Sequence, residues 1–317
     1  MNDELPIVND TPATAPVPSR LARALKTPQG KGAAVLVVLV VLFGIATQQV
    51  YSRPVDDTLV RILSRVLPYP ALSVNGTTVT LNEFLSEYDA LKQYFAGQEG
   101  ASPTDDELEV AIADTLVNKV VIRQLAQARG LEVDSERVEQ YYQEVLAAQE
   151  SEEAFVEDLR ETFGWSAKEF QSRIVESIVL ALQMSEAILS DEALQGPRRD
   201  MIDAAFARVA GGEDFVSVAR EVHAGFGAGL ESDLGYVKLS AIPSSWSSQV
   251  EALAVGGMTD VLDLPEGYAV FKAEDRIVAA DEVQIRLLSI TVPKVTLEEA
   301  VGDYLETSKV KRYVGEI

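Results

Sequence analysis

The 317-residue chain contains no cysteine and only one histidine, His223. Without cysteine it can form no disulfide and carry no cysteine-linked lipid, and a core of this size does not depend on disulfides. One histidine without cysteine also leaves too few ligands for a structural or catalytic zinc ion. A Ser-His-Asp triad would have to use His223. We therefore predict no metal site and no cofactor.

Basic residues are scarce as well. The chain has 27 Lys and Arg against 50 Asp and Glu, which gives a net charge of −23. The first 50 residues hold four basic and three acidic side chains, so the rest of the chain carries −24. Nucleic-acid phosphates require Lys and Arg, so we predict no nucleic-acid partner.

One segment lacks charge altogether: Ala33–Thr47 is apolar and follows a group of four basic residues, Arg20, Arg23, Lys26 and Lys31. Roughly 17–25 residues of helix cross a bilayer. We predict a transmembrane helix over 32–51 that contacts the inner membrane through 33–50. The tail, 1–31, would be cytoplasmic and the remainder periplasmic. A cleaved signal peptide is the alternative, but the long tail before the apolar run and the lack of an A-x-A site after it favour an uncleaved anchor.

Residues 52–70 are predicted to connect the membrane to the rest of the chain. They contain an apolar stripe at helical spacing, flanked by Arg61 and Arg65. Its members are Leu59, Ile62, Leu63, Val66 and Leu67. Such a helix either lies in the lipid interface or packs on the globular part, and both interpretations stay open.

The segment 71–195 is predicted to be all-α. Four capping boxes mark helix starts in the chain, at Thr80–Glu83, Thr104–Glu107, Ser166–Glu169 and Thr296–Glu299. The segment 107–129 is apolar on more than one side, which is typical of a helix buried among others. Further helices are expected over 135–149, 152–163 and 167–194, the last closed by Gly196-Pro197.

After Gly196 the pattern becomes α+β with an antiparallel sheet, and α+β is the fold class predicted for the chain. Helices are expected over 198–210, 214–222 and 246–254, and an amphipathic one over Thr296–Tyr313. The expected strands are 233–238, 261–264, 267–275 and 283–291.

The helical segment 71–195 resembles the SurA-type N-terminal chaperone domain of membrane-anchored and secreted foldases. The resemblance is carried by the order and spacing of several pieces, namely Val74-Asn75-Gly76, Leu116–Gly130, Val133-Asp134 and Phe163-Gly164-Trp165-Ser166. In SurA-like proteins a C-terminal segment completes this domain. The resemblance thus implies that the helix in 293–317 packs on the chaperone domain.

Residues 196–292 resemble a parvulin-type (PpiC) peptidyl-prolyl isomerase domain. The matching pieces are Ala210–Phe215, Ser232–Tyr236 and Gly267–Lys272. The family's first strand, which carries an Arg-His motif, does not precede the helix at 198. The segment 283–291 has the alternation of that strand, with Leu287 where the histidine would lie. In the family the first and last strands lie side by side, so a circularly permuted domain is one hypothesis. An extra edge strand or an interdomain connector is the other.

The resemblance also implies a candidate site, an apolar cup for a proline ring. Its lining would be Ile242 and Trp246, in place of the family's Met and Phe, together with Leu287, Ala269 and Phe271. Because Leu287 and Ala269 stand where the two histidines would be, we predict no catalytic residue. His223 either faces this cup as a polar group or caps the end of its helix.

These observations predict a membrane-anchored periplasmic chaperone that binds unfolded or nascent exported polypeptides and has lost isomerase activity. Two alternatives stay open. One is an active parvulin-type peptidyl-prolyl isomerase that uses a remodelled site. The other is a dedicated assembly or scaffold subunit of one envelope complex.

Overall fold

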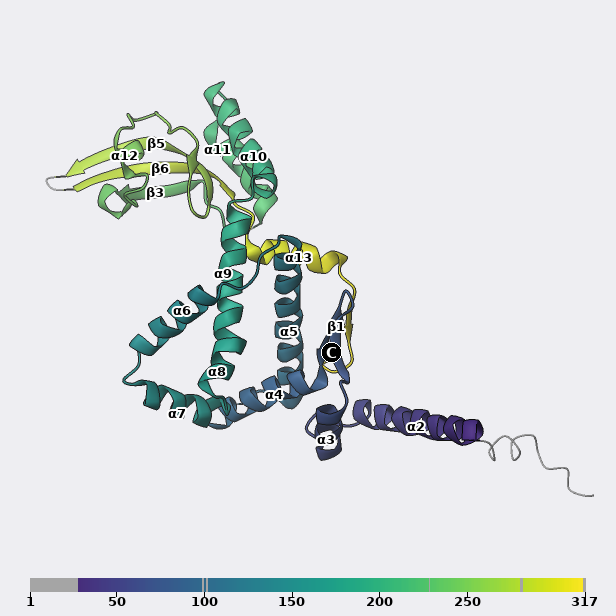
Figure 1. Cartoon of the computed structure of the whole chain (residues 1–317). Helices are drawn as coiled ribbons and strands as arrows, with labels where there is room; N and C mark the ends of the chain where they lie inside the picture. Colours follow the sequence, from purple (N-terminus) through teal and green to yellow (C-terminus); the bar gives the residue numbers. More distant parts are fainter. Residues whose placement is uncertain (1–27, 99, 101, 228, 280–281, 316–317) are drawn as a thin grey trace, which may run out of the picture.

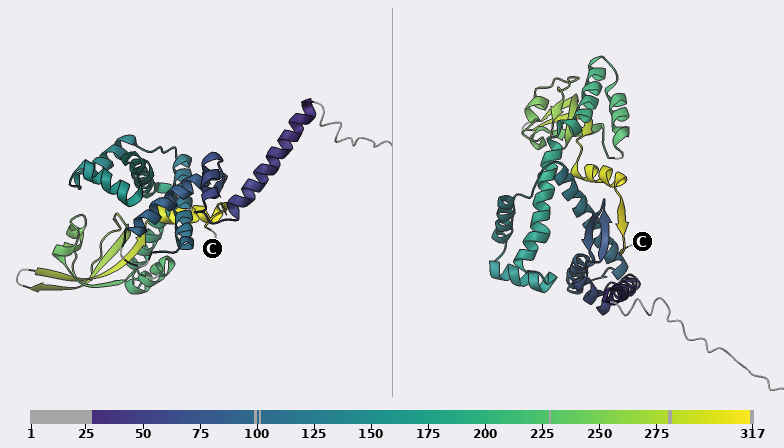
Figure 2. Two further views of the ribbon diagram at one scale, coloured as in Figure 1. Left: turned by 90° about the horizontal axis from the view of Figure 1, so that it is seen from below. Right: turned by 45° about the vertical axis from the view of Figure 1, so that its right-hand side comes forward.

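The computed structural model of the chain describes residues 28–98, 100, 102–227, 229–279 and 282–315. Most of the predicted tail, 1–31, lies outside them. The helix α2 (Pro28–Tyr51) leaves the rest of the molecule as a rod (Figures 1 and 2). Within the part of the chain whose side chains are described, no helix has both the length and the apolar character needed to cross a membrane. The span over 32–51 stays a prediction.

The connector forms helix α3 (Thr58–Val66), which begins where the carboxylate of Asp57 accepts a hydrogen bond from the N–H of Leu59 at 2.8 Å. Val60 is buried against the body of the protein, and Arg61 pairs with Asp89 of helix α4 (Leu81–Ala96) at 2.6 Å. Three members of the predicted stripe remain exposed, Leu59, Ile62 and Val66. The helix thus packs on the globular part and still presents apolar side chains outward.

The segment 71–195 is not all-α, because it opens with the hairpin of β1 (Pro70–Val74) and β2 (Thr77–Thr80). An Asn75-Gly76 turn joins the two strands, with positive φ at both residues. This dipeptide between β-branched runs is a strong hairpin signal, and the prediction of a purely helical domain overlooked it. A third strand, β7 (Val310–Arg312), completes a sheet of order β2-β1-β7.

Helices α4 (Leu81–Ala96), α5 (Asp105–Ala128) and α9 (Glu176–Leu189) form the helical body. The prediction that 107–129 is a buried helix is confirmed, since α5 buries nine side chains. Its N-terminus and that of α8 (Ala167–Phe170) carry complete capping boxes, whereas at Thr80 and Thr296 the hydroxyl accepts from the Glu N–H without a reciprocal bond among the described contacts.

An arm made of α6 (Ser135–Ala147) and α7 (Glu152–Phe163) projects from this body (Figure 1). The two helices confirm the predictions over 135–149 and 152–163. The arm has a small aromatic core of its own around Tyr142, Phe155 and Leu159. It returns through α8 and a π-helical turn (Gln171–Val175) to α9. The predicted helix over 167–194 is therefore interrupted.

Gly196-Pro197 does not end a helix. Helix α9 ends at Leu189, and α10 (Glu192–Ala210) starts where the carboxylate of Asp191 accepts from the N–H groups of Ala193 and Leu194. Pro197 lies inside α10. The N-cap at Asp191 starts α10 before Gly196-Pro197, so this dipeptide does not break the helix. Helix α10 then continues into the C-terminal module.

The C-terminal module consists of α10, α11 (Phe215–His223) and a four-stranded antiparallel sheet of order β3-β6-β5-β4. Its strands are β3 (Asp233–Lys238), β4 (Leu262–Asp263), β5 (Gly267–Ala279) and β6 (Glu282–Pro293). Helices α10 and α11 cover one face of the sheet (Figure 1), where Phe215 and Ile202 pack on Val270 and Ile290. The short α12 (Ser247–Glu251) and its flanking loops cover the other face.

The chain then returns to the helical body. Helix α13 (Leu297–Thr307) packs Leu297, Val301 and Leu305 against the main core of α4, α5 and α9. The predicted helix over Thr296–Tyr313 is too long, because its last residues form β7 instead. In β7, Val310 pairs with Val74 of β1 and Arg312 with Leu72. The C-terminal segment thus contributes both a helix and a strand to the N-terminal part of the molecule (Figure 2).

Candidate functional site

A pocket opens on the C-terminal module, on the face of the sheet that α12 covers. Its floor is formed by Ala269 and Phe271 of β5 and by Ser289 and Thr291 of β6. The loop before α12, the segment before β3 and the β4–β5 turn form its walls. The wall residues are Gly229, Leu230, Glu231, Leu234, Pro243, Ser245, Trp246, Leu264, Pro265, Glu266 and Gly267.

The firmest part of this pocket is an aromatic pair. The rings of Trp246 and Phe271 are stacked, with their centroids 4.5 Å apart and 6° between their planes. Such pairs add about 0.5–1.5 kcal/mol beyond the burial of their area. The backbone of Phe271 is fixed by a hydrogen bond, in which its N–H donates to the hydroxyl of buried Thr259 at 3.0 Å. The stack therefore provides a preformed apolar surface at one side of the pocket.

Three of the five predicted cup residues line the pocket, namely Trp246, Ala269 and Phe271. The other two, Ile242 and Leu287, lie in the core behind it. Leu287 sits opposite Ala273 in the β5–β6 ladder, whereas Ser289 is opposite Phe271 and lines the pocket. Sequence reasoning missed Ser289, although alternation along the strand places it on the same face as Leu287 and one step nearer to Ala269.

His223 does not line the pocket, and its side chain does not cap the carbonyl groups at the end of its helix. Its Nε2 accepts a hydrogen bond from the backbone N–H of Thr291 at 3.0 Å. That N–H lies beyond the end of β3, whose pairing with β6 stops at Leu288. Burial lowers the pKa of His223, and a backbone hydrogen bond with Leu230 acts in the opposite direction. The imidazole thus satisfies a strand N–H beneath the pocket.

The pocket has few polar side chains. The hydroxyl of Ser289 donates to the carbonyl oxygen of Glu231 at 2.8 Å, which ties the wall to the floor. Ser245 and Thr291 add two more hydroxyls. Among the lining residues, Glu231 and Glu266 carry the ionisable side chains, and both are exposed. The arrangement can hold an apolar group and hydrogen-bond to a peptide, but it brings no imidazole to the bound group.

A second candidate region lies in the helical body between α5 and α9. A shallow pocket there has an apolar floor of Ile122, Val133 and Leu180, with Lys119, Arg123, Glu176 and Ser177 around it. Further along α9, Leu182 and Leu189 are exposed and lie seven residues apart, which places them on one side of the helix. Exposed apolar side chains of this kind are available to a hydrophobic segment of another polypeptide.

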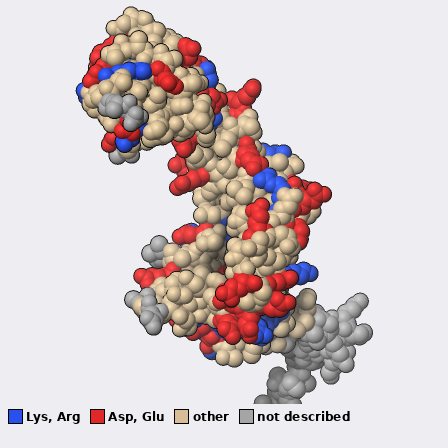
Figure 3. Space-filling model, turned by 90° about the vertical axis from the view of Figure 1, so that its left-hand side faces the viewer, with Lys and Arg blue, Asp and Glu red and all other residues tan. Residues whose placement is uncertain are grey.

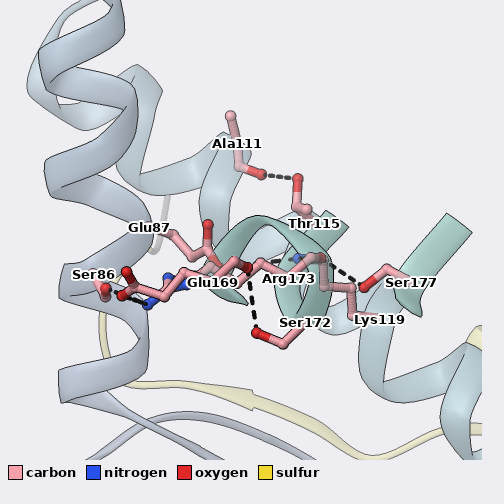
Figure 4. Close-up of polar contacts among 9 residues, drawn as sticks. All are labelled: Ser86, Glu87, Ala111, Thr115, Lys119, Glu169, Ser172, Arg173 and Ser177. Atoms are coloured by element: carbon pink, nitrogen blue, oxygen red, sulfur yellow. Dashed lines mark hydrogen bonds and ion pairs between the residues drawn. The ribbon is translucent and has the colours of Figure 1, made fainter. Parts of the chain in front are cut away.

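The π-helical turn beside this region is held by a half-buried polar cluster (Figure 4). The guanidinium of Arg173 donates to the hydroxyl of Ser86 at 2.7 Å and pairs with Glu87 at 3.3 Å. The backbone carbonyl oxygen of Arg173 accepts hydrogen bonds from the Lys119 ammonium at 3.2 Å and from the Ser177 hydroxyl at 2.8 Å. A π-helical turn leaves carbonyl groups free to accept such bonds. The cluster fixes the arm against α4 and α5.

Acidic side chains outnumber basic ones in the chain, 50 to 27. Figure 3 shows carboxylates spread over the C-terminal module and the helical body, with fewer basic groups among them. This distribution agrees with the net charge of −23.

Comparison with known proteins assigns the first part of this architecture. Residues 32–172 match the model of the SurA-like N-terminal domain. This stretch covers most of α2, then α3, the β1–β2 hairpin and the helices through α8. SurA-like domains bind unfolded polypeptides in general, so the match indicates a chaperone-like function. No curated protein matches the chain, and no parvulin-type domain model matches its C-terminal module.

Proposed function

We propose that this protein is a membrane-anchored periplasmic chaperone that binds unfolded or newly exported polypeptides. The observation that carries the proposal is the match of residues 32–172 to the SurA-like N-terminal domain. The exposed apolar side chains beside α9 and the aromatic pocket of the C-terminal module provide two surfaces for an extended client. The acidic surface keeps such a protein soluble while it exposes apolar groups.

We further propose that the C-terminal module is a circularly permuted, parvulin-like domain. This hypothesis requires 283–291 to pair antiparallel with 267–272, as the first and last strands of the family do. In the structure, Ala269 is opposite Thr291 and Lys272 is opposite Leu288. A connector or an added edge strand would not need a central place in the sheet, whereas β6 lies between β3 and β5.

The composition of the pocket supports binding without catalysis. Prolyl isomerisation requires crossing a barrier of about 18–20 kcal/mol, which positioned polar groups lower by favouring the twisted amide. Ala269 and Phe271 offer no such group, and His223 is occupied by the Thr291 N–H. A second candidate function is an active isomerase with a remodelled site. It is favoured by three hydroxyl groups in the pocket, which could act as the positioned polar groups: those of Ser245, Ser289 and Thr291.

The membrane anchor is supported by the uncharged run Ala33–Thr47 and by the exposure of Leu39 and Phe43 along α2. Helix α3 adds Ile62 and Val66, exposed apolar residues near the end of α2, with basic Arg65 beside them. A basic amphipathic helix next to a span is suited to the lipid interface. Release of the protein from membranes by alkaline carbonate, rather than by detergent alone, would contradict the anchor.

One experiment separates the functions. The full chain, purified in detergent, is tested for suppression of aggregation of a chemically denatured client, and the same sample is tested for isomerisation of a prolyl peptide. We expect suppression near stoichiometric ratio and no acceleration of isomerisation. Isomerisation well above the uncatalysed rate would establish the enzyme instead. Crosslinking in membranes that captures one partner, with no suppression, would establish a dedicated assembly subunit.

A further inference from the structure

The charged side chains that line the C-terminal pocket are both acidic. Glu231 stands on the wall before β3, and Glu266 stands on the β4–β5 turn. Both side chains are exposed, and within the described part of the chain neither carboxylate forms an ion pair. The remaining lining residues are uncharged. An apolar pocket therefore opens between two free carboxylates.

Two basic residues beside these walls, Lys294 and Arg286, are already paired with other acids. Lys294 donates to the carbonyl oxygen of lining Leu264 at 2.9 Å, but its ammonium pairs with Asp263 at 2.5 Å. Arg286, behind the other wall, pairs with Asp233 at 2.6 Å and with Glu274 at 3.3 Å. Neither of these two cations pairs with Glu231 or Glu266.

A ligand that suits this pocket has an apolar part and a cationic part. The Trp246–Phe271 stack and Ala269 accept an aliphatic or prolyl side chain, and the free carboxylates attract an ammonium or guanidinium on a neighbouring residue. An acidic neighbour is repelled, and repulsion contributes to specificity as much as attraction does.

We propose that this pocket selects polypeptide segments in which an apolar or prolyl residue is flanked by Lys or Arg. The inference rests on the proposed chaperone function, since it names the class of client segment that the same pocket takes. Such segments are common where positively charged stretches border apolar ones. Exposed ion pairs are individually weak, so two of them amount to about a three- to tenfold preference.

The test uses the full chain in detergent and three fluorescent peptides that share one Leu-Pro core. Their flanking residues are Lys, Gln or Glu, and binding is followed by fluorescence anisotropy at low salt. We expect the dissociation constants to rise in the order Lys, Gln, Glu, with Lys and Glu separated by about tenfold or more. Added salt should shrink this range, because exposed charges are screened.

The double variant E231Q/E266Q should bind all three peptides with nearly equal affinity. The matched control, E144Q/E150Q, removes two exposed carboxylates from the arm and should keep the preference for Lys. Equal binding of the three peptides by the unaltered chain, or a preference that survives E231Q/E266Q, overturns the inference while the chaperone function stands. Failure to bind any peptide, together with failure to suppress aggregation, overturns the proposed function itself.

Discussion

Asn75 and Lys309 lie 234 positions apart and are joined by two hydrogen bonds. The N–H of Asn75 donates to the carbonyl oxygen of Lys309 at 3.0 Å, and the N–H of Lys309 donates to the Oδ1 of Asn75 at 2.9 Å. The Asn75 amide also donates to Ser308 and Gln124, at 3.0 and 3.1 Å. One turn residue therefore links the β1–β2 hairpin, α5 and the returning C-terminal segment.

This relationship predicts that the side chain of Asn75 holds the C-terminal segment in place. Asn75 has φ 52°, a conformation that Gly adopts freely and Ala does not. Asn75→Gly should cost about 1–3 kcal/mol through lost hydrogen bonds, and Asn75→Ala should cost more through added backbone strain. Hydrogen exchange should show faster exchange at 308–313 in both variants. Asn118→Ala, on the exposed side of α5, serves as the control, and equal exchange in all three variants would refute the prediction.

A second long-range contact predicts a stabilising role for Gln195 at the junction of the two parts of the molecule. Its buried amide donates to the carbonyls of Ile188 and Val295 and accepts from the Val295 N–H, all at 3.0 Å. Gln195→Met keeps the length of the side chain but leaves these groups unpaired. Each unpaired buried group costs about 1–3 kcal/mol. Urea unfolding followed by circular dichroism should show this loss, and an unchanged midpoint would contradict it.

Local signals accounted for much of the helical part. Thr104 and Glu107 specify the start of α5 between them, so no distant residue is needed to place it. The same holds for α7, which Gly164 ends in the left-handed conformation. By contrast, β7 is three residues long and exists because it pairs with Leu72–Val74. A strand whose stability comes from a partner so far along the chain leaves little trace in its own sequence.

The pocket shows a similar division. The sequence indicates which residue types surround the pocket. Whether a given residue lines the pocket or lies in the core behind it depends on the register of the strands. Leu287 and Ser289 are both inward-facing on β6, and the β-bulge between Ala273 and Asp275 shifts the register farther along the hairpin. His223 was expected either in the cup or at its helix end. It binds the Thr291 N–H, because β3 stops short of that position.

Gly267 predicts a strong response to a small substitution. A Cβ at this position would lie 2.6 Å from the carbonyl oxygen of Val292 and 3.0 Å from the Cα of Pro293, where backbone cannot move away cheaply. Gly267→Ala should destabilise the C-terminal module by about 1–3 kcal/mol. Gly302 in α13 is the control, because nothing lies within 4 Å of its Cβ position. Gly302→Ala should raise stability by about 0.5–1 kcal/mol. The two changes are compared by thermal unfolding, and shifts of the same sign would be evidence against this account.

Substitutions at Trp246 and Ile242 should differ in their effect on peptide binding. Trp246 lines the pocket, so Trp246→Ala should weaken binding of the Lys-flanked peptide by about 1–3 kcal/mol, or roughly five- to 150-fold. Ile242 lies in the core behind the pocket. Ile242→Val should lower stability by about 0.5–1.5 kcal/mol and leave the dissociation constant unchanged. Fluorescence anisotropy and urea unfolding of both variants test this, and a stronger binding defect in Ile242→Val would place the binding surface elsewhere.

His223 predicts a pH dependence that can be assigned without ambiguity, because it is the chain's one histidine. Its pKa in the folded protein is lowered from 6.5, mainly by burial. The unfolded chain therefore takes up a proton first as the pH falls. Stability should be constant above about pH 7 and should decline as the pH falls from about 6.5 toward the lowered pKa of the folded state. Protonation also removes the Nε2 lone pair that accepts from Thr291.

The matched variant is His223→Gln, which has no group that titrates in this window and can still offer an acceptor. Burial raises the pKa of Glu109, which gives a contribution of the opposite sign, but Glu109 is present in both proteins and cancels in the comparison. Urea unfolding at half-unit steps between pH 5 and 8 should show a decline in the unaltered chain that is steeper than in His223→Gln. Parallel curves would mean that the imidazole is not linked to folding, and the pairing of His223 with the Thr291 N–H would then have no energetic role.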